Sequence, residues 1–160
     1  MKERAVELGG DGRLILHGQH TVSADTARQW AVPEAFVAAL AQGGVVTAGL
    51  DGCLWMYPAA GWKVFVERAS PRLPLTQAAA REFARHVFGQ AHAVSFDDGS
   101  LSKEGKLVLP EHLCRMAGID GELVWVGLLD HFELWSPERW QAQLSRVSLS
   151  GMADLAVLGI

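Results

Sequence analysis

Two short polar segments carry the residue types best suited to contacting an anionic ligand. The first, DTARQ at residues 25–29, presents an arginine and a glutamine amide. The second, SKEGK at residues 102–106, presents two lysines around a glycine. Cationic and amide side chains on tight loops can bind phosphate oxygens or the edges of nucleic-acid bases. The alternative is that both segments are exposed hairpin tips with ordinary surface charges.

Catalytic and metal-binding patterns are sparse. The chain contains no GxSxG, HExxH or CxxC motif and no phosphate-binding glycine loop. His17 and His20 could share a strand or a turn, but we interpret them as ordinary strand histidines rather than metal ligands. Asp97 and Asp98 lie in DDGS, a composition typical of a turn. We therefore expect no enzyme activity, no catalytic residue, no metal and no cofactor.

Composition restricts the class of protein further. The 160 residues carry a formal net charge of −4, so any contact with nucleic acid must come from a local patch. A hydrophobic content of 49% is enough for a folded core. We interpret Cys53 and Cys114 as buried residues of a reducing compartment. No apolar run approaches the roughly 18 residues of a membrane span, and we expect a cytoplasmic protein.

The elements that must position the two loops occur twice in the chain. An apolar residue followed by Pro and Glu occurs at Pro33 and recurs at Pro110. Farther along, Leu-Asp followed by Pro occurs at Asp51 and recurs at Asp130, after nearly the same interval. We interpret this as an internal duplication whose two copies form a pseudo-twofold pair. A module of about 50 residues buries little surface alone, so we expect strands to pair across the copies.

Each copy is predicted to fold as ββαββ. Gly105 permits the sharp turn of the second loop, and Pro33 and Pro110 suit the first position of a helix. We expect helices at 33–41, 58–69, 77–88, 110–117 and 136–147, with Thr76 and Ser136 as helix caps. The expected divisions are a first module at 14–70, a linker helix at 71–90, a second module at 91–147 and a tail at 148–160.

The longer motifs resemble one known family. The segments VVTAGLDGCLWMYP (45–58), LPLT (73–76), GKLVLPEHL (105–113) and GELVWVGLLDHFELWSPERW (121–140) resemble the MraZ family, bacterial transcriptional regulators of the division and cell-wall gene cluster. The resemblance covers about residues 14–147. It implies an α+β fold of two swapped-hairpin, AbrB-like modules that form a double β-barrel with flanking helices. It also implies a homo-oligomeric ring, such as an octamer.

In this family, binding to double-stranded promoter DNA is attributed to a DxxxR motif on the hairpin turn of each copy. Both motifs are altered here. Asp25 keeps the aspartate, whereas Gln29 stands at the arginine and Arg28 at the preceding glycine; in the second copy Ser102 replaces the aspartate, Gly105 is kept and Lys106 stands for the arginine. The resemblance implies a DNA-facing set of Asp25, Arg28, Gln29, Ser102, Lys103 and Lys106.

Two functions remain open at this point. One is a divergent, sequence-specific DNA-binding regulator associated with the nucleoid. The other is a ring-forming scaffold or protein-interaction module that has lost DNA binding.

Overall fold

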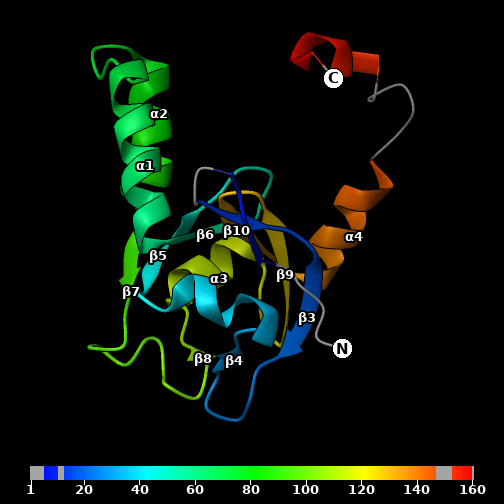
Figure 1. The fold of residues 1–160 in the computed structure, drawn as a ribbon. Coiled ribbons are helices and arrows are strands. Elements are labelled where there is room, and N and C mark those ends of the chain that lie inside the picture. Colours follow the sequence, from blue (N-terminus) through cyan, green and yellow to red (C-terminus); the bar gives the residue numbers. More distant parts are fainter. Residues whose placement is uncertain (1–5, 11–12, 147–152, 160) are drawn as a thin grey trace.

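A six-stranded antiparallel sheet forms the centre of the computed structural model, which describes residues 6–10, 13–146 and 153–159 (Figure 1). The strands lie in the order β3 (Gln19–Ser23), β9 (Glu122–Leu128), β10 (His131–Trp135), β6 (Leu54–Pro58), β5 (Gly44–Ala48) and β7 (His92–Val94). Strand β3 of the first copy pairs with β9 of the second, and β7 of the second pairs with β5 of the first. The expected pairing across copies is confirmed.

The remaining elements flank this sheet. Strand β1 (Val6–Leu8) pairs with β2 (Leu14–Leu16), and β4 (Trp30–Ala31) pairs with β8 (Lys106–Leu107). The helices are η1 (Glu34–Leu40), α1 (Ala59–Ala69), η2 (Ser70–Arg72), α2 (Ala78–Val87), α3 (Glu111–Ala117), α4 (Pro137–Ser145) and η3 (Ala153–Leu158). Elements β3, β4, η1, β5 and β6 of the first copy match β7, β8, α3, β9 and β10 of the second, which confirms the duplicated α+β fold; β2 is an additional strand at the start of the first copy. The described strands form open sheets and do not close into a barrel.

Strand registers show that the two copies are related by a pseudo-twofold axis. Trp30 pairs directly with Leu107, its counterpart in the second copy when the two Pro-Glu motifs are aligned. In the central pair of strands, Leu54 pairs with Leu134 and Trp55 pairs with Glu133. When the two Leu-Asp motifs are aligned, Glu133 is the counterpart of Leu54 and Leu134 is the counterpart of Trp55. Leu54 therefore pairs with the counterpart of Trp55, and Trp55 pairs with the counterpart of Leu54. Such reciprocal pairing arises when a twofold axis passes between the strands.

The second copy carries an insertion that the regular spacing of the two motifs did not predict. Thr21 pairs with Val124 and Ala93 pairs with Val45, which makes Ala93 the counterpart of Thr21. Farther along each copy, equivalent β-bridges join Ala24 to Trp30 in the first copy and Leu101 to Leu107 in the second. The chain is longer between Ala93 and Leu101 than between Thr21 and Ala24. The additional residues lie between β7 and the second loop, in the turn that contains DDGS.

Helix positions follow the sequence signals closely, with two corrections. Ser136 caps α4 by accepting a hydrogen bond from the Arg139 amide at 3.2 Å, as predicted. The cap of α2 is Gln77 rather than Thr76, and no side chain caps that helix. The segment after Pro33 forms a 3-10 helix instead of an α-helix. In a 3-10 helix, residues three apart align, which places Phe36 and Ala39 together in the core.

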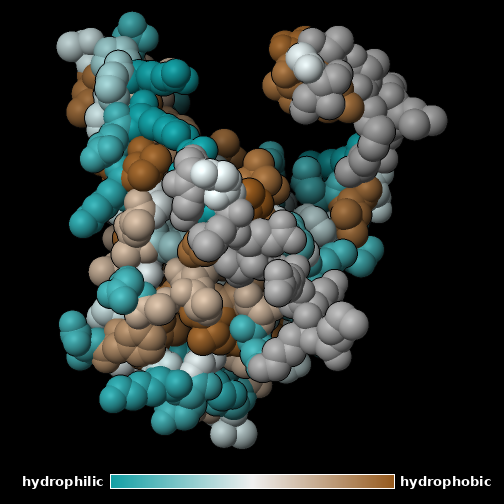
Figure 2. Space-filling model, in the orientation of Figure 1, coloured by the Kyte–Doolittle hydropathy of each residue, from teal (hydrophilic) through white to brown (hydrophobic). Residues whose placement is uncertain are grey.

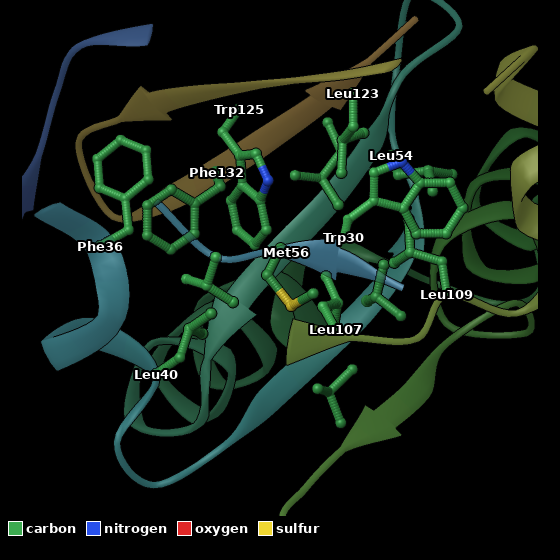
Figure 3. Packing of buried hydrophobic residues seen from close by; sticks show 14 of the residues in the cluster. Trp30, Phe36, Leu40, Leu54, Met56, Leu107, Leu109, Leu123, Trp125 and Phe132 are labelled. Atoms are coloured by element: carbon green, nitrogen blue, oxygen red, sulfur yellow. The ribbon is translucent and has the colours of Figure 1, made fainter. Parts of the chain in front are cut away.

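Both faces of the sheet are buried. Along β6, Leu54 and Met56 point into one core, whereas Trp55 and Tyr57 point into a second core on the opposite face. Figure 3 shows part of the first core, in which Trp125 lies beside Phe132 of β10, and Phe36 of η1 packs on Phe132. The second core packs against the apolar side chains Trp62, Phe65, Phe83 and Phe88 of the segment that contains α1 and α2. Two-sided burial explains the long apolar runs in the sequence.

Gly127 lies where β9 passes close to the chain before β3. Its amide donates a hydrogen bond to the Gly18 carbonyl at 2.8 Å. A Cβ at Gly127 would lie 2.5 Å from the His17 backbone nitrogen. We expect Gly127→Ala to lower the free energy of unfolding by about 1–3 kcal/mol, because the backbone must move to relieve the overlap.

Chemical denaturation at a fixed protein concentration measures this effect. Gly121→Ala is the matched control, since no heavy atom lies within 4 Å of its added Cβ. We expect that control to change the free energy of unfolding by no more than about 0.5 kcal/mol. Equal stabilities for the two variants would contradict the close approach at Gly127.

Candidate nucleic-acid interface

The two polar loops lie at the same end of the molecule. Pairing of β4 with β8 brings residues 25–29 and 102–106 together, and the Val32 amide donates a hydrogen bond to the Gly105 carbonyl at 2.7 Å. Both loops project from the lower end in Figure 1, where Figure 2 shows mainly hydrophilic atoms. The two loops therefore lie at one edge of the pseudo-twofold pair.

The two loops close through the same hydrogen bonds. The Asp25 carboxylate accepts from the Gln29 amide at 2.9 Å, and the Ser102 hydroxyl accepts from the Lys106 amide at 3.1 Å. In each loop, the backbone amide of the first residue also donates to the carbonyl of the fifth, at 2.9 and 2.8 Å. Ser102 therefore replaces the motif aspartate as a turn-forming residue without its charge.

A left-handed backbone conformation is required at the fourth position of each loop. Gly105 adopts φ +78°, which glycine accepts without strain. Its counterpart Arg28 adopts φ +55°, a conformation that costs a residue with a side chain roughly 1–2 kcal/mol. The first loop thus tolerates strain in order to present an arginine where the second loop has glycine.

Carboxylates contact two of the three cationic side chains in these loops. Arg28 donates a hydrogen bond to Asp120 at 3.2 Å and lies 5.7 Å from the centre of the Trp30 ring. The Lys106 ammonium lies 3.7 Å from Asp25. Both ion pairs are partly exposed, so each contributes at most about 1 kcal/mol and can exchange for a phosphate. Lys103 is exposed and has no ion pair within the described part of the chain.

Sequence reasoning missed two charged residues at this surface. Asp120 pairs with Arg28 across 92 positions of sequence, and no local pattern indicated that contact. Arg115 lines the same hollow of about 670 Å³ as Arg28. Its placement could have been inferred from α3, since Arg115 follows Glu111 by one helical turn and pairs with it at 3.1 Å.

Acidic side chains equal the basic ones in number in and beside the loops. The cations are Arg28, Lys103, Lys106 and Arg115, and the carboxylates are Asp25, Glu104, Glu111 and Asp120. A single copy therefore offers little net attraction for a polyanion, and any affinity must come from specific contacts or from repetition.

Asp25 supplies a pH-dependent prediction. The backbone hydrogen bond from Gln29 is the main cause that lowers the pKa of the Asp25 carboxyl, and Lys106 contributes less. At pH values above the pKa of the unfolded chain, near 3.9, the ionised carboxyl stabilises the folded turn. This stabilisation is lost as the pH falls through the lowered pKa of the folded state. We expect NMR titration to place its midpoint below that of an unfolded peptide. Lys106→Ala should preserve most of the shift, and a return to the ordinary pKa would make the ion pair its cause.

Outside the two loops, the residues considered above for chemistry lie in positions that explain them structurally. The His20 ring contacts Phe36 edge-on at 5.1 Å. Asp98 caps its turn by accepting from the Ser100 amide at 2.8 Å, as the DDGS composition predicted. Both cysteines are free and buried, as expected. Within residues 6–10, 13–146 and 153–159, no group of three His, Cys, Asp or Glu side chains could hold a metal, and no helix is long and apolar enough to cross a membrane.

Comparison with known proteins agrees with this architecture. The family model "MraZ protein" matches twice, at residues 1–86 and 87–157. A transcriptional regulator MraZ from Clostridium acetobutylicum is 35% identical over 145 residues, which cover 89% of this chain and 98% of that protein. The MraZ regulator of Thermomicrobium roseum is 36% identical (84% and 90% covered), and that of Deinococcus radiodurans is 32% identical (81% and 87% covered). Each matched half contains one of the two interleaved copies, and the chain belongs to the MraZ family.

Proposed function

We propose that this protein is a sequence-specific DNA-binding transcriptional regulator that acts on the promoter of the division and cell-wall gene cluster. The names of its relatives support the regulatory role. One structural observation carries the assignment of the surface: two turns with the same hydrogen bonds present their side chains from one end of a pseudo-twofold core. The protein acts in the cytoplasm, on the nucleoid, as a homo-oligomeric ring.

The residues of the loops define how DNA is bound. Lys103 and Lys106 neutralise phosphates, and Arg28 exchanges Asp120 for a phosphate or a guanine edge. Gln29 donates and accepts hydrogen bonds at base edges without adding charge. Asp25 and Ser102 hold the turns. Because the carboxylates at this surface balance its cations, useful affinity depends on repeating the loops around a ring, where avidity can add about 10²-fold or more.

The ion pairs also favour a second candidate function. Arg28 and Lys106 both contact carboxylates of the same chain, and only Lys103 among the loop cations lacks such a partner in the described residues. A ring-forming scaffold with no affinity for DNA would present this same neutralised surface.

A binding titration separates the two functions. A labelled duplex from upstream of the protein's own gene and a shuffled duplex of equal length would be titrated at about 50 and 200 mM salt. The regulator should prefer the upstream duplex and lose affinity steeply as salt rises. Absence of binding to either duplex at the lower salt concentration would favour the scaffold.

A further inference from the structure

An apolar groove opens between β2 and the beginning of α1. A cavity of about 280 Å³ is lined by Leu14, Leu16, Pro58, Ala60, Gly61 and Val64, with Arg13, Arg68 and Asp130 at its charged positions. Leu14 and Val64 are 37% and 38% exposed. Because a cavity of about 150 Å³ can hold benzene, this groove can accept apolar side chains from outside.

The hairpin turn between β9 and β10 extends the same apolar surface. Leu128 and Leu129 line an adjoining hollow and are 44% and 68% exposed. Leu129 adopts φ +68°, whereas the matching turn of the first copy uses Asp51 and Gly52 at positive φ. The backbone of Leu129 exchanges two hydrogen bonds with Leu16, at 2.7 and 2.8 Å. A strained, exposed leucine on a rigid turn indicates a surface built for contact.

A second apolar surface lies at the other end of the chain. We call α4 and η3 together the C-terminal arm; Leu144 in α4 is 41% exposed, and Leu155, Val157 and Leu158 in η3 are 38%, 87% and 69% exposed. Figure 1 shows η3 apart from the sheet, and Figure 2 shows hydrophobic atoms on it. Residues 148–160 contain a single charged residue, Asp154. A segment with so little charge suits a groove whose lining is mainly apolar.

We propose that η3 of one copy occupies the groove between β2 and α1 of the next copy. Groove and arm are different surfaces of one chain, so their contact is head-to-tail and generates a ring when the rotation closes. Helix α4 packs on β9, whereas α1 packs on β5 and β6, so the arm begins on a different part of the sheet from the groove. This inference rests on the ring of the proposed function and names the contact that builds it.

Cysteine cross-linking between two single variants tests the contact. Full-length Val157→Cys and Val64→Cys proteins, mixed at micromolar concentration under mild oxidation, should give a disulfide-linked dimer that neither variant gives alone. Burial raises the pKa of both native thiols, Cys53 and Cys114, and keeps their background reactivity low. In the double variant, linked multimers are expected. An internally linked monomer would overturn the proposal, because the arm would then cover its own groove.

Light scattering provides the second readout. Val157→Asp combined with Leu158→Asp, and separately Val64→Asp, should weaken association by at least about tenfold, because the mainly apolar lining of the groove would then cover a charged side chain and desolvate it. Leu75→Asp is the control, since Leu75 is 59% exposed and lies outside both surfaces. Masses equal to wild type in the arm and groove variants would overturn the proposal. DNA binding is measured separately, so a cross-linked ring without DNA affinity refutes the regulator and leaves this contact intact.

Discussion

Replacing Trp125 by alanine is expected to lower the free energy of unfolding by about 3–5 kcal/mol. Its side chain is fully buried, at 0% exposure, and its ring contacts Phe132 edge-on at 5.4 Å and Phe36 at 6.3 Å. Removal of the indole would leave a cavity that the sheet, buried on both faces, cannot close by collapsing. Urea unfolding followed by circular dichroism at a fixed protein concentration measures the loss.

Trp125→Phe is the matched control for that experiment. The indole N–H of Trp125 is buried and has no hydrogen-bond partner in the described part of the chain. Phenylalanine therefore keeps much of the apolar contact and loses no hydrogen bond, so we expect a smaller cost than for alanine. Trp30→Phe should cost more than Trp125→Phe, because the Trp30 indole donates to the Gly121 carbonyl at 3.2 Å. An alanine variant within about 1 kcal/mol of wild type would contradict the packing argument.

The largest expected change in function comes from removing the three loop cations. The variant with Arg28→Ala, Lys103→Ala and Lys106→Ala should bind its upstream DNA at least tenfold more weakly at low salt. Each lost phosphate contact should flatten the dependence of log affinity on log salt by about 0.9 per engaged subunit. Its oligomeric mass and stability should change little, since the two ion pairs that it removes are partly exposed and each contributes at most about 1 kcal/mol.

A charge-matched control distinguishes specific contact from net charge. Lys63, Arg72 and Arg85 are exposed on the segment that carries α1 and α2, and their replacement by alanine changes the net charge equally. We expect that variant to keep the wild-type salt dependence. Gln29→Arg, which restores the charge of the family motif in the first loop, should raise affinity. Equal binding by wild type and the loop variant at every salt concentration would place the DNA-binding surface elsewhere.

Local signals in the sequence determined the elements and their repetition. Pro110 was expected at the first helical position but is the N-cap of α3, with φ −57° and ψ 133°, so it marks the start of that helix from one residue before it. Ser136 caps α4 through its own hydroxyl. Asp51 and Gly52 close a hairpin because both adopt positive φ. These effects act over a few residues, and the duplication repeats the same motifs after nearly the same interval. The two polar loops could also be identified from the sequence, because the residues that define each loop lie within five consecutive positions.

Contacts between distant segments were decided only by the tertiary structure. The pairing of β3 with β9 and of β7 with β5 depends on which register buries apolar side chains on both faces of the sheet. The pattern of apolar residues within one strand does not identify the strand that pairs with it. The same holds for the insertion after β7 and for Asp120 beside Arg28. The sequence predicted which side chains could bind an anion, but the fold set the carboxylates that contact them, because a charge 92 residues away becomes a neighbour only after the two copies interleave.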